Sequence, residues 1–224
     1  MSQDIIELPS IYHEVYDRLR QRIASGNILP GEKISIRSIA DTFGVSTMPV
    51  REALRKLQAE GFVTFHRRSV IVNRLSAEEV KQIFQIRLRL ELLAAEWALD
   101  KVTGRDLQDL NAILQAMEQD ISVKEWRKQN RLFHIRFYEC AQSPHLIELI
   151  TNVWDKVEPY MTIYTSTVED FAEAHKQHAE ILKTIQDRNL PQLLQTITYH
   201  LEYTSHIVSQ ALTGKPEFWG DRDH

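Results

Sequence analysis

Beyond about residue 75, apolar residues recur three and four positions apart, which is the spacing of helices with one buried face. Helix start signals precede several of these stretches. Ser76-Ala77-Glu78-Glu79 and Ser122-Val123-Lys124-Glu125 fit capping boxes, and Ser143 stands directly before a proline. The pattern predicts six helices, at about residues 77–100, 104–119, 123–140, 144–163, 168–188 and 190–212.

The first 75 residues follow a different pattern. A helix over about residues 10–25 is expected to end at Gly26, a short one over 37–43 at Gly44, and a third, from near Ser46, at Gly61. Two β-rich runs follow, residues 62–65 and 70–72, around the polar tip 66–69. The pattern predicts a helix-turn-helix with a hairpin wing.

The sequence therefore predicts a mainly α protein of two domains. Residues 1–75 form a winged helix-turn-helix of three helices and a β-hairpin, and residues 76–224 form an all-helical six-helix bundle. A hydrophobic fraction of 43% allows both domains to bury cores without disulfides or structural metals.

Charge is distributed unevenly along the chain. Residues 1–75 hold 11 Lys and Arg against 8 Asp and Glu, whereas the remainder holds 16 against 23. Phosphate contacts are therefore expected only in the first domain. One cysteine, Cys140, and the lack of any long uncharged apolar stretch or leader-like N-terminus favour the cytoplasm, with no membrane partner.

The third predicted helix separates into two faces. Val50, Leu54 and Leu57 recur at helical spacing and should pack inward, whereas Arg51 and Arg55 share a neighbouring face. A guanidinium fork suits guanine or phosphate, and the helix N-terminus adds oriented N–H groups. The alternative is a solvated charged face with Glu52 and Lys56 paired.

Residues 11–73 resemble the winged-helix domain of the GntR family. The similarity lies in Ile34-Ser35-Ile36-Arg37-Ser38-Ile39-Ala40, in Gly44-Val45-Ser46 and in Pro49-Val50-Arg51-Glu52-Ala53-Leu54. The resemblance implies that Arg37, Arg51 and Arg55 face DNA and that the wing tip enters the minor groove. The DNA-binding set so implied is Arg37, Ser46, Thr47, Arg51, Arg55, Arg67, Arg68 and Ser69.

Two positions depart from the family pattern. Thr47 stands where the family usually has arginine, and Ser69 where it usually has glycine, so base readout should differ. Arg67 and Arg68 are candidates to compensate, because arginine is attracted to a narrow minor groove; the alternative is a solvated turn.

Three histidines occupy interior positions of different predicted helices. Each of His134, His178 and His200 alone is more often a satisfied core or surface residue, but histidines on several helices of a bundle also build metal centres. Trp97, Trp126 and Trp154 are expected to pack in the core, with an effector-lining wall as the alternative.

Residues 76–213 resemble the FCD ligand-binding domain of the FadR-like branch of that family. The similarity rests on Arg87-Leu88-Arg89-Leu90-Glu91, Asn130-Arg131-Leu132-Phe133-His134, His178-Ala179-Glu180-Ile181-Leu182 and His200-Leu201. It implies a divalent metal, Zn²⁺, Ni²⁺ or Mn²⁺, on these three histidines and a fourth position usually held by aspartate. Asn130 stands there and should weaken binding.

The same resemblance implies that Arg87 holds the carboxylate of an effector, a salt bridge to Glu91 being the alternative. The function so predicted is a homodimeric, ligand-responsive transcription regulator, a repressor rather than an enzyme, that binds operator DNA and a small organic acid. The alternatives are a metal-dependent enzyme with an appended DNA-binding domain and an architectural DNA-binding protein. The chain shows no HExxH, nucleophile motif or phosphate loop.

Overall fold

The computed structural model describes residues 11–67, 69–119, 121–167 and 171–214. The chain is mainly helical, with one small antiparallel sheet, and divides into two compact units with the boundary between Ser76 and Ala77. The mainly α fold predicted from the hydrophobic pattern is confirmed. Within the described residues, no helix combines the length and the apolar character needed to cross a membrane.

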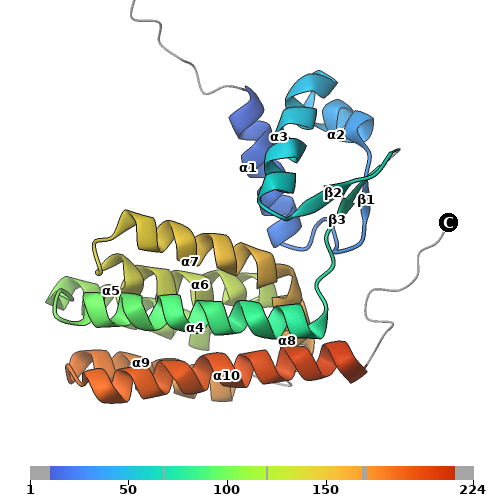
Figure 1. Ribbon diagram of the computed structural model, residues 1–224. Coiled ribbons are helices and arrows are strands. Elements are labelled where there is room, and N and C mark those ends of the chain that lie inside the picture. The colour runs from blue at the N-terminus through green and yellow to red at the C-terminus, as the bar shows by residue number, and fades with distance from the viewer. Residues whose placement is uncertain (1–10, 68, 120, 168–170, 215–224) are drawn as a thin grey trace, which may run out of the picture. The chain divides into compact units, whose positions relative to one another are not determined.

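The first unit is a winged helix-turn-helix (Figure 1). Its helices are α1 (Ile11–Ala24), α2 (Ile36–Phe43) and α3 (Thr47–Ala59). The wing is the antiparallel hairpin of β2 (Val63–Phe65) and β3 (Val70–Val72). A third strand, β1 (Lys33–Ile34), pairs with the other side of β3, so the strand order is β1-β3-β2.

Local sequence fixes the turn between α2 and α3. Gly44 adopts the left-handed conformation (φ 66°), and its N–H donates to carbonyls of the preceding helix. This is the backbone position for which glycine carries the smallest steric penalty. At the other end of α2, the Ser35 side chain accepts from the N–H of Ser38. The predicted glycine stop is therefore confirmed here.

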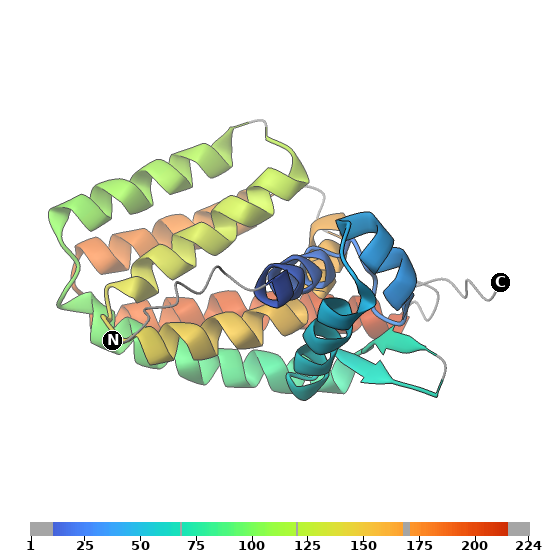
Figure 2. The ribbon, with the colours of Figure 1, turned by 90° about the horizontal axis from the view of Figure 1, so that it is seen from above.

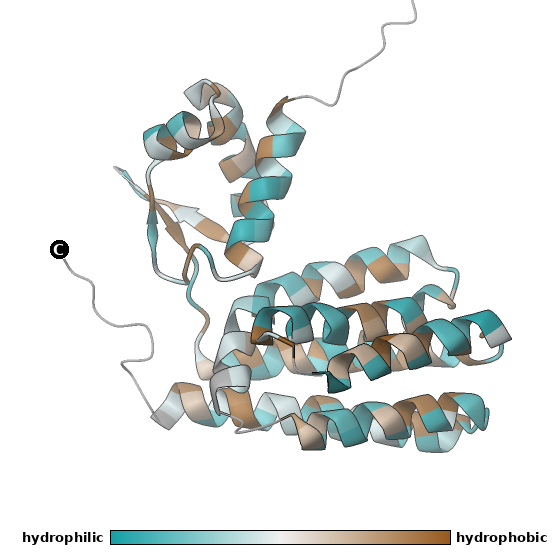
Figure 3. Ribbon diagram, turned by 180° about the vertical axis from the view of Figure 1, so that it is seen from behind, coloured by the Kyte–Doolittle hydropathy of each residue, from teal (hydrophilic) through white to brown (hydrophobic). Residues whose placement is uncertain are grey.

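The second unit is a bundle of long helices. They are α4 (Ala77–Leu99), α5 (Gly104–Glu118), α6 (Val123–Glu139), α7 (Pro144–Val157), α8 (Met161–Thr167), α9 (Ala172–Gln186) and α10 (Leu190–Gly214). Helix α10 packs most extensively against α4, and α5 lies beside α6 (Figure 2). Hydrophobic and hydrophilic residues are interspersed along these helices, as expected of helices that bury one face (Figure 3).

The caps of the second unit are partly those predicted. Ser122 and Ser143 accept hydrogen bonds from the backbone N–H groups of Glu125 and Leu146. A reciprocal capping box, not predicted, joins Thr103 and Asp106 at the start of α5. The hydrogen bond from the Thr103 side chain is the main cause that lowers the pKa of Asp106 to about 2.

The single helix predicted over residues 144–163 is wrong. Helix α7 ends at Val157, a 3-10 turn, η1 (Glu158–Tyr160), follows, and α8 begins at Met161. Pro159 lies in this turn, where its missing N–H and its ring interrupt a regular helix. The next helix begins at Ala172 rather than at residue 168, and residues 168–170 lie outside the described part of the chain.

Candidate DNA-binding face and buried histidine cavity

Helix α3 buries one face and exposes the other. Val50, Leu54 and Leu57 are completely buried, whereas Arg51 and Arg55 are exposed. The alternative pair of Glu52 with Lys56 does not form, because the Lys56 ammonium instead lies 3.9 Å from the centre of the Tyr16 ring. The two faces are those predicted from helical spacing, and the arginine face is free to approach a groove.

Other candidate DNA-binding residues lie on α2 and in the wing. Arg37, at the start of α2, and Arg67, in the wing, are exposed, while Ser69 is partly buried. A groove of about 540 Å³ is lined by Arg51, Arg67 and Ser69 together with Lys33 from β1. Within the described residues, neither Arg37, Arg51, Arg55 nor Arg67 forms an ion pair. Arg68, also predicted to bind DNA, lies outside the described residues.

The N-terminus of α3 carries a feature that sequence reasoning missed. Ser46 occupies the N-cap position without a side-chain cap hydrogen bond, and Thr47 beside it is exposed. Met48 follows and is 64% exposed, an unusual state for a large apolar side chain. The sequence signal for this exposure is the place of Met48 in the first turn of α3, immediately after Thr47.

In the second unit, α6, α9 and α10 bring the three predicted histidines together. His134, His178 and His200 are all buried, and one ring nitrogen of each lies within 4.8 Å of the others. The Nε2 atoms of His134 and His178 are 3.0 Å apart. The three histidines, which lie 44 and then 22 positions apart along the chain, thus form one cluster.

Neighbouring groups orient two of these rings. His178 Nδ1 lies 2.5 Å from the carbonyl oxygen of Ala174, and His200 Nδ1 lies 2.8 Å from the side-chain oxygen of Gln177. Both partners accept, so each Nδ1 carries the proton and each neutral ring keeps an Nε2 lone pair. Metal-binding histidines typically donate their second ring N–H to a neighbouring oxygen in this way. Three imidazole nitrogens also suit a divalent transition metal. Sequence reasoning missed Gln177.

Burial keeps the cluster neutral. It lowers the pKa of His178 to about 4 and those of His134 and His200 well below their usual value. Repulsion among the rings and from Arg87 acts in the same direction for His134 and His200. Neutral imidazole is the form that binds metals.

Arg87 lies buried beside the cluster and pairs with Glu91, so the predicted salt bridge is present. Arg87 Nε donates to Glu91 at 3.0 Å, and the guanidinium lies over the rings of Phe84 and Trp154. Glu91, 0% exposed, also accepts from Trp154 Nε1 at 2.7 Å and from the Tyr138 hydroxyl at 2.9 Å. Three donors offset the desolvation of this carboxylate and hold Arg87 in place.

The guanidinium is only partly used by this ion pair. Within the described residues, the two Nη nitrogens of Arg87 make no hydrogen bond. Arg87 lines a cavity of about 20 Å³ together with Asn130, His134 and His200. The predicted effector residue and most of the predicted metal set thus share one cavity, and His178 contacts His134 without lining the cavity itself.

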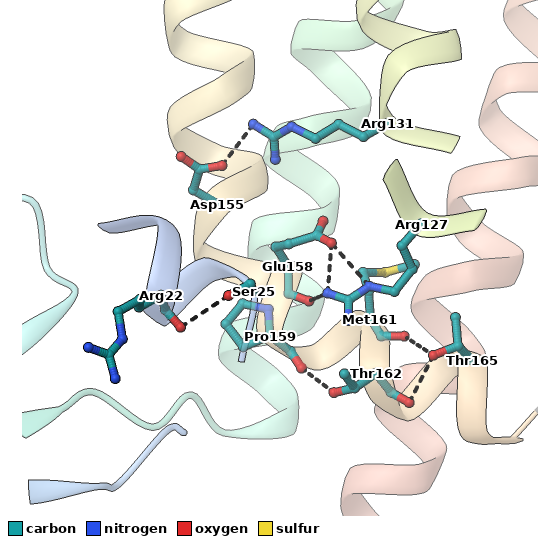
Figure 4. Close-up of polar contacts among 10 residues, drawn as sticks. All are labelled: Arg22, Ser25, Arg127, Arg131, Asp155, Glu158, Pro159, Met161, Thr162 and Thr165. Atoms are coloured by element: carbon teal, nitrogen blue, oxygen red, sulfur yellow. Dashed lines mark hydrogen bonds and ion pairs between the residues drawn. The ribbon is translucent and has the colours of Figure 1, made fainter. Parts of the chain in front are cut away.

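Ion pairs tie α6 to the end of α7 and to η1, beside this cavity. Arg127 donates to the carboxylate of Glu158 at 2.7 Å and also to its carbonyl, and Arg131 pairs with Asp155 at 2.8 Å (Figure 4). Glu158 and Met161 belong to the cavity wall. The break between α7 and α8 therefore lies at the cavity, where a continuous helix had been predicted.

The pKa values of the histidines predict acid sensitivity of the metal-free protein. The unfolded chain takes up protons below about pH 6.5, but folded His178 does so only near pH 4, so stability is lost as pH falls through this window. His178 alone should lower the free energy of unfolding by about 2 kcal/mol between pH 7 and pH 5. Urea denaturation of chelator-treated protein measures this change.

The matched variants for that experiment are His178→Gln and His145→Gln. His145 is exposed on α7, so its replacement should leave the pH dependence as in wild type, whereas His178→Gln should reduce it. An equal pH dependence in all three proteins would contradict the assigned burial effect.

A winged helix with free arginines on its third helix, joined to a helical unit with a charged internal cavity, defines a ligand-responsive DNA-binding protein. Comparisons with known proteins agree. Residues 11–72 match the family described as bacterial regulatory proteins, gntR family, and residues 82–203 match the FCD domain. The chain belongs to the GntR family of transcription regulators and carries the FCD effector-binding domain.

Named relatives support this class. The chain is 28% identical over 216 residues to the HTH-type transcriptional regulator YdhC of Bacillus subtilis, covering 92% of this chain and 96% of YdhC. It is 29% identical over 192 residues to the gluconate operon transcriptional repressor of that organism, covering 80% and 77%. The solved structure of Escherichia coli McbR shares the fold, with a TM-score of 0.80 at 23% identity over 91% and 99% of the two chains. Neither these proteins nor the matched families favour the enzyme alternative.

Proposed function

We propose that the regulator responds to a small organic acid bound in the cavity of the second unit. The observation that carries this proposal is the buried Arg87, whose Nη nitrogens are unused within the described residues and which lines the same cavity as the histidines. A guanidinium repels cations but binds a carboxylate well through paired N–H groups. Glu91 binds Arg87 through Nε, which leaves the two Nη nitrogens for the carboxylate of the effector.

We also propose that His134, His178 and His200 hold a divalent metal, with the Asn130 amide oxygen as a weak fourth ligand. When bound, the metal supplies a Lewis acid that attracts a carboxylate oxygen of the effector. Asn130 supports this assignment by lining the cavity, and its side chain makes no hydrogen bond within the described part of the chain. A neutral amide contributes less attraction to the cation than a carboxylate does.

For the first unit we propose that Arg51 and Arg55 of α3 bind the major groove of operator DNA. Arg37 and the N-terminus of α3 would contact phosphates, and the wing would bind the adjacent minor groove through Arg67, Arg68 and Ser69. The gluconate operon relative is named a repressor, which supports repression as the mode of action. Control of chromosomal operators would place this protein in the cytoplasm.

A calorimetric screen of small carboxylates tests the effector proposal. An acid at 100 times its dissociation constant should add about 2.7 kcal/mol to the free energy of unfolding. Arg87→Lys keeps a positive charge beside Glu91 but removes the bidentate fork, so the acid should bind it more weakly. An acid that binds wild type and Arg87→Lys equally would contradict the assigned role of Arg87.

We expect a homodimer, because one winged helix makes too few contacts for specific binding and two-fold related half-sites are the usual remedy. Ile86 and Trp97, three turns apart on α4, are exposed apolar residues and support such an interface. Sedimentation should give about twice the chain mass of 26.2 kDa, and footprinting should show a palindrome. Protection of a single asymmetric half-site by one chain would refute this expectation.

A further inference from the structure

The side chain of Trp126 brings to the cavity wall a polar group that the proposed carboxylate site does not use. The residue is 2% exposed and lines the cavity beside Asn130 and His134. Its indole Nε1 is buried and has no hydrogen-bond partner within the described residues. Buried N–H groups are nearly always paired, so an orphaned donor on a cavity wall points to a missing acceptor.

Helix α6 places this donor in line with the site described above. Trp126, Asn130 and His134 follow one another at intervals of four residues, which puts them on one face of the helix. All three line the cavity. The same helix face thus presents, turn by turn, an indole N–H, a side-chain amide and an imidazole.

Aromatic packing holds the indole in its orientation. Its ring stacks on Phe171 with centroids 4.2 Å apart and on Tyr164 with centroids 6.5 Å apart. Because an indole N–H lies in the plane of the ring, this stacking also fixes the plane in which the N–H lies. By contrast, Trp154 on the same cavity wall has its N–H fully used by Glu91.

We propose that the indole N–H of Trp126 donates to a second oxygen of the effector. The cavity would then select carboxylic acids that carry a hydroxyl or keto oxygen besides the carboxylate over the matching unsubstituted acids. This inference rests on the proposed carboxylate site, in which Arg87 takes the carboxylate. A bound water is the competing occupant, since about 20 Å³ is enough for one, and it would leave no preference between such acids.

Calorimetric titration of the full-length protein with matched acids tests the proposal. The probes are propionate with lactate and pyruvate, succinate with malate and oxaloacetate, and glutarate with 2-hydroxyglutarate and 2-oxoglutarate. In any series that binds, wild type should bind the hydroxy or keto acid about ten-fold or more tightly than the unsubstituted acid, because the latter leaves a buried donor unpaired. Trp126→Phe keeps an aromatic ring but lacks the N–H, so the preference should fall to within about two-fold.

Trp97→Phe is the matched control, because it makes the same change at an indole that does not line the cavity and should keep the wild-type preference. If Trp126→Phe does not fold, the ¹⁵N-labelled indole signal of Trp126 in wild type replaces it. That signal should shift further with the substituted acid than with the unsubstituted one.

The outcomes separate the two proposals. Equal binding of substituted and unsubstituted acids by wild type, a preference that survives in Trp126→Phe, or equal indole shifts would overturn the role of Trp126. In these cases the carboxylate site stands if Arg87→Lys still weakens binding. If wild type binds none of the nine acids, both proposals fail.

Discussion

Replacing Arg51 by alanine is expected to weaken operator binding about 5- to 150-fold, which corresponds to the roughly 1–3 kcal/mol of a bidentate arginine–base contact. Arg51 is exposed on α3, lines the groove beside the wing and has no ion-pair partner within the described residues. Arg55→Ala should act in the same direction. Fluorescence anisotropy with an operator selected from random DNA by the wild-type protein measures the loss.

Two controls separate a lost DNA contact from other effects. Arg89→Ala removes one positive charge from an exposed position of α4 and should leave operator affinity nearly unchanged. Circular dichroism melting of Arg51→Ala should match wild type, because the buried face of α3 is intact. Wild-type affinity in both Arg51→Ala and Arg55→Ala would refute the assignment of this face.

Replacing His134 by alanine is expected to abolish specific metal binding. Loss of a residue that only hydrogen-bonds to a metal ligand lowers metal affinity by up to roughly 100-fold. Loss of one of the three imidazoles themselves should lower metal affinity by more than that. Asn130→Asp should tighten binding instead, because it adds a negative charge at the fourth position. Competition with a chelator, followed by elemental analysis at neutral pH, measures both changes. Wild-type occupancy should fall only as pH approaches about 4, where the folded His178 takes up a proton.

His175→Ala is the matched control for the metal experiment. His175 lies one turn before His178 on α9, but its Nε2 faces Glu118 at 2.6 Å and stands outside the cluster. Its removal should leave metal content as in wild type. Absence of metal from wild type, Asn130→Asp and His134→Ala alike would end the metal proposal.

The sequence predicts elements well where the signal is local. Gly44 ends α2 and Ser143 caps α7 through contacts within four residues, and both were read correctly. The break at Pro159 was missed because apolar spacing continues across residues 144–163. Strand β1 has only two residues and exists because it pairs with β3, which no local pattern reveals.

Within the candidate site, the sequence predicts which helices carry the polar residues but not how their side chains pair. The pairing of Arg87 with Glu91 was foreseen as an alternative, because one helical turn separates them. Gln177 reaches His200 only because α9 packs on α10, and this contact between helices is not visible in the sequence. Trp126 was expected to be a packing residue, which its burial bears out, but its unpaired N–H depends on the tertiary surroundings. Trp97, expected in the core, is 45% exposed.

The most direct test of ligand-controlled DNA binding is operator affinity with and without a bound acid. An acid that binds wild type in calorimetry is added at 100 times its dissociation constant, and operator affinity is measured by anisotropy. A coupling of about 1–3 kcal/mol predicts a 5- to 150-fold change in operator affinity. Arg87→Lys should show this change only at higher acid concentrations. An operator affinity that stays the same in wild type with the acid bound would contradict effector control through this cavity.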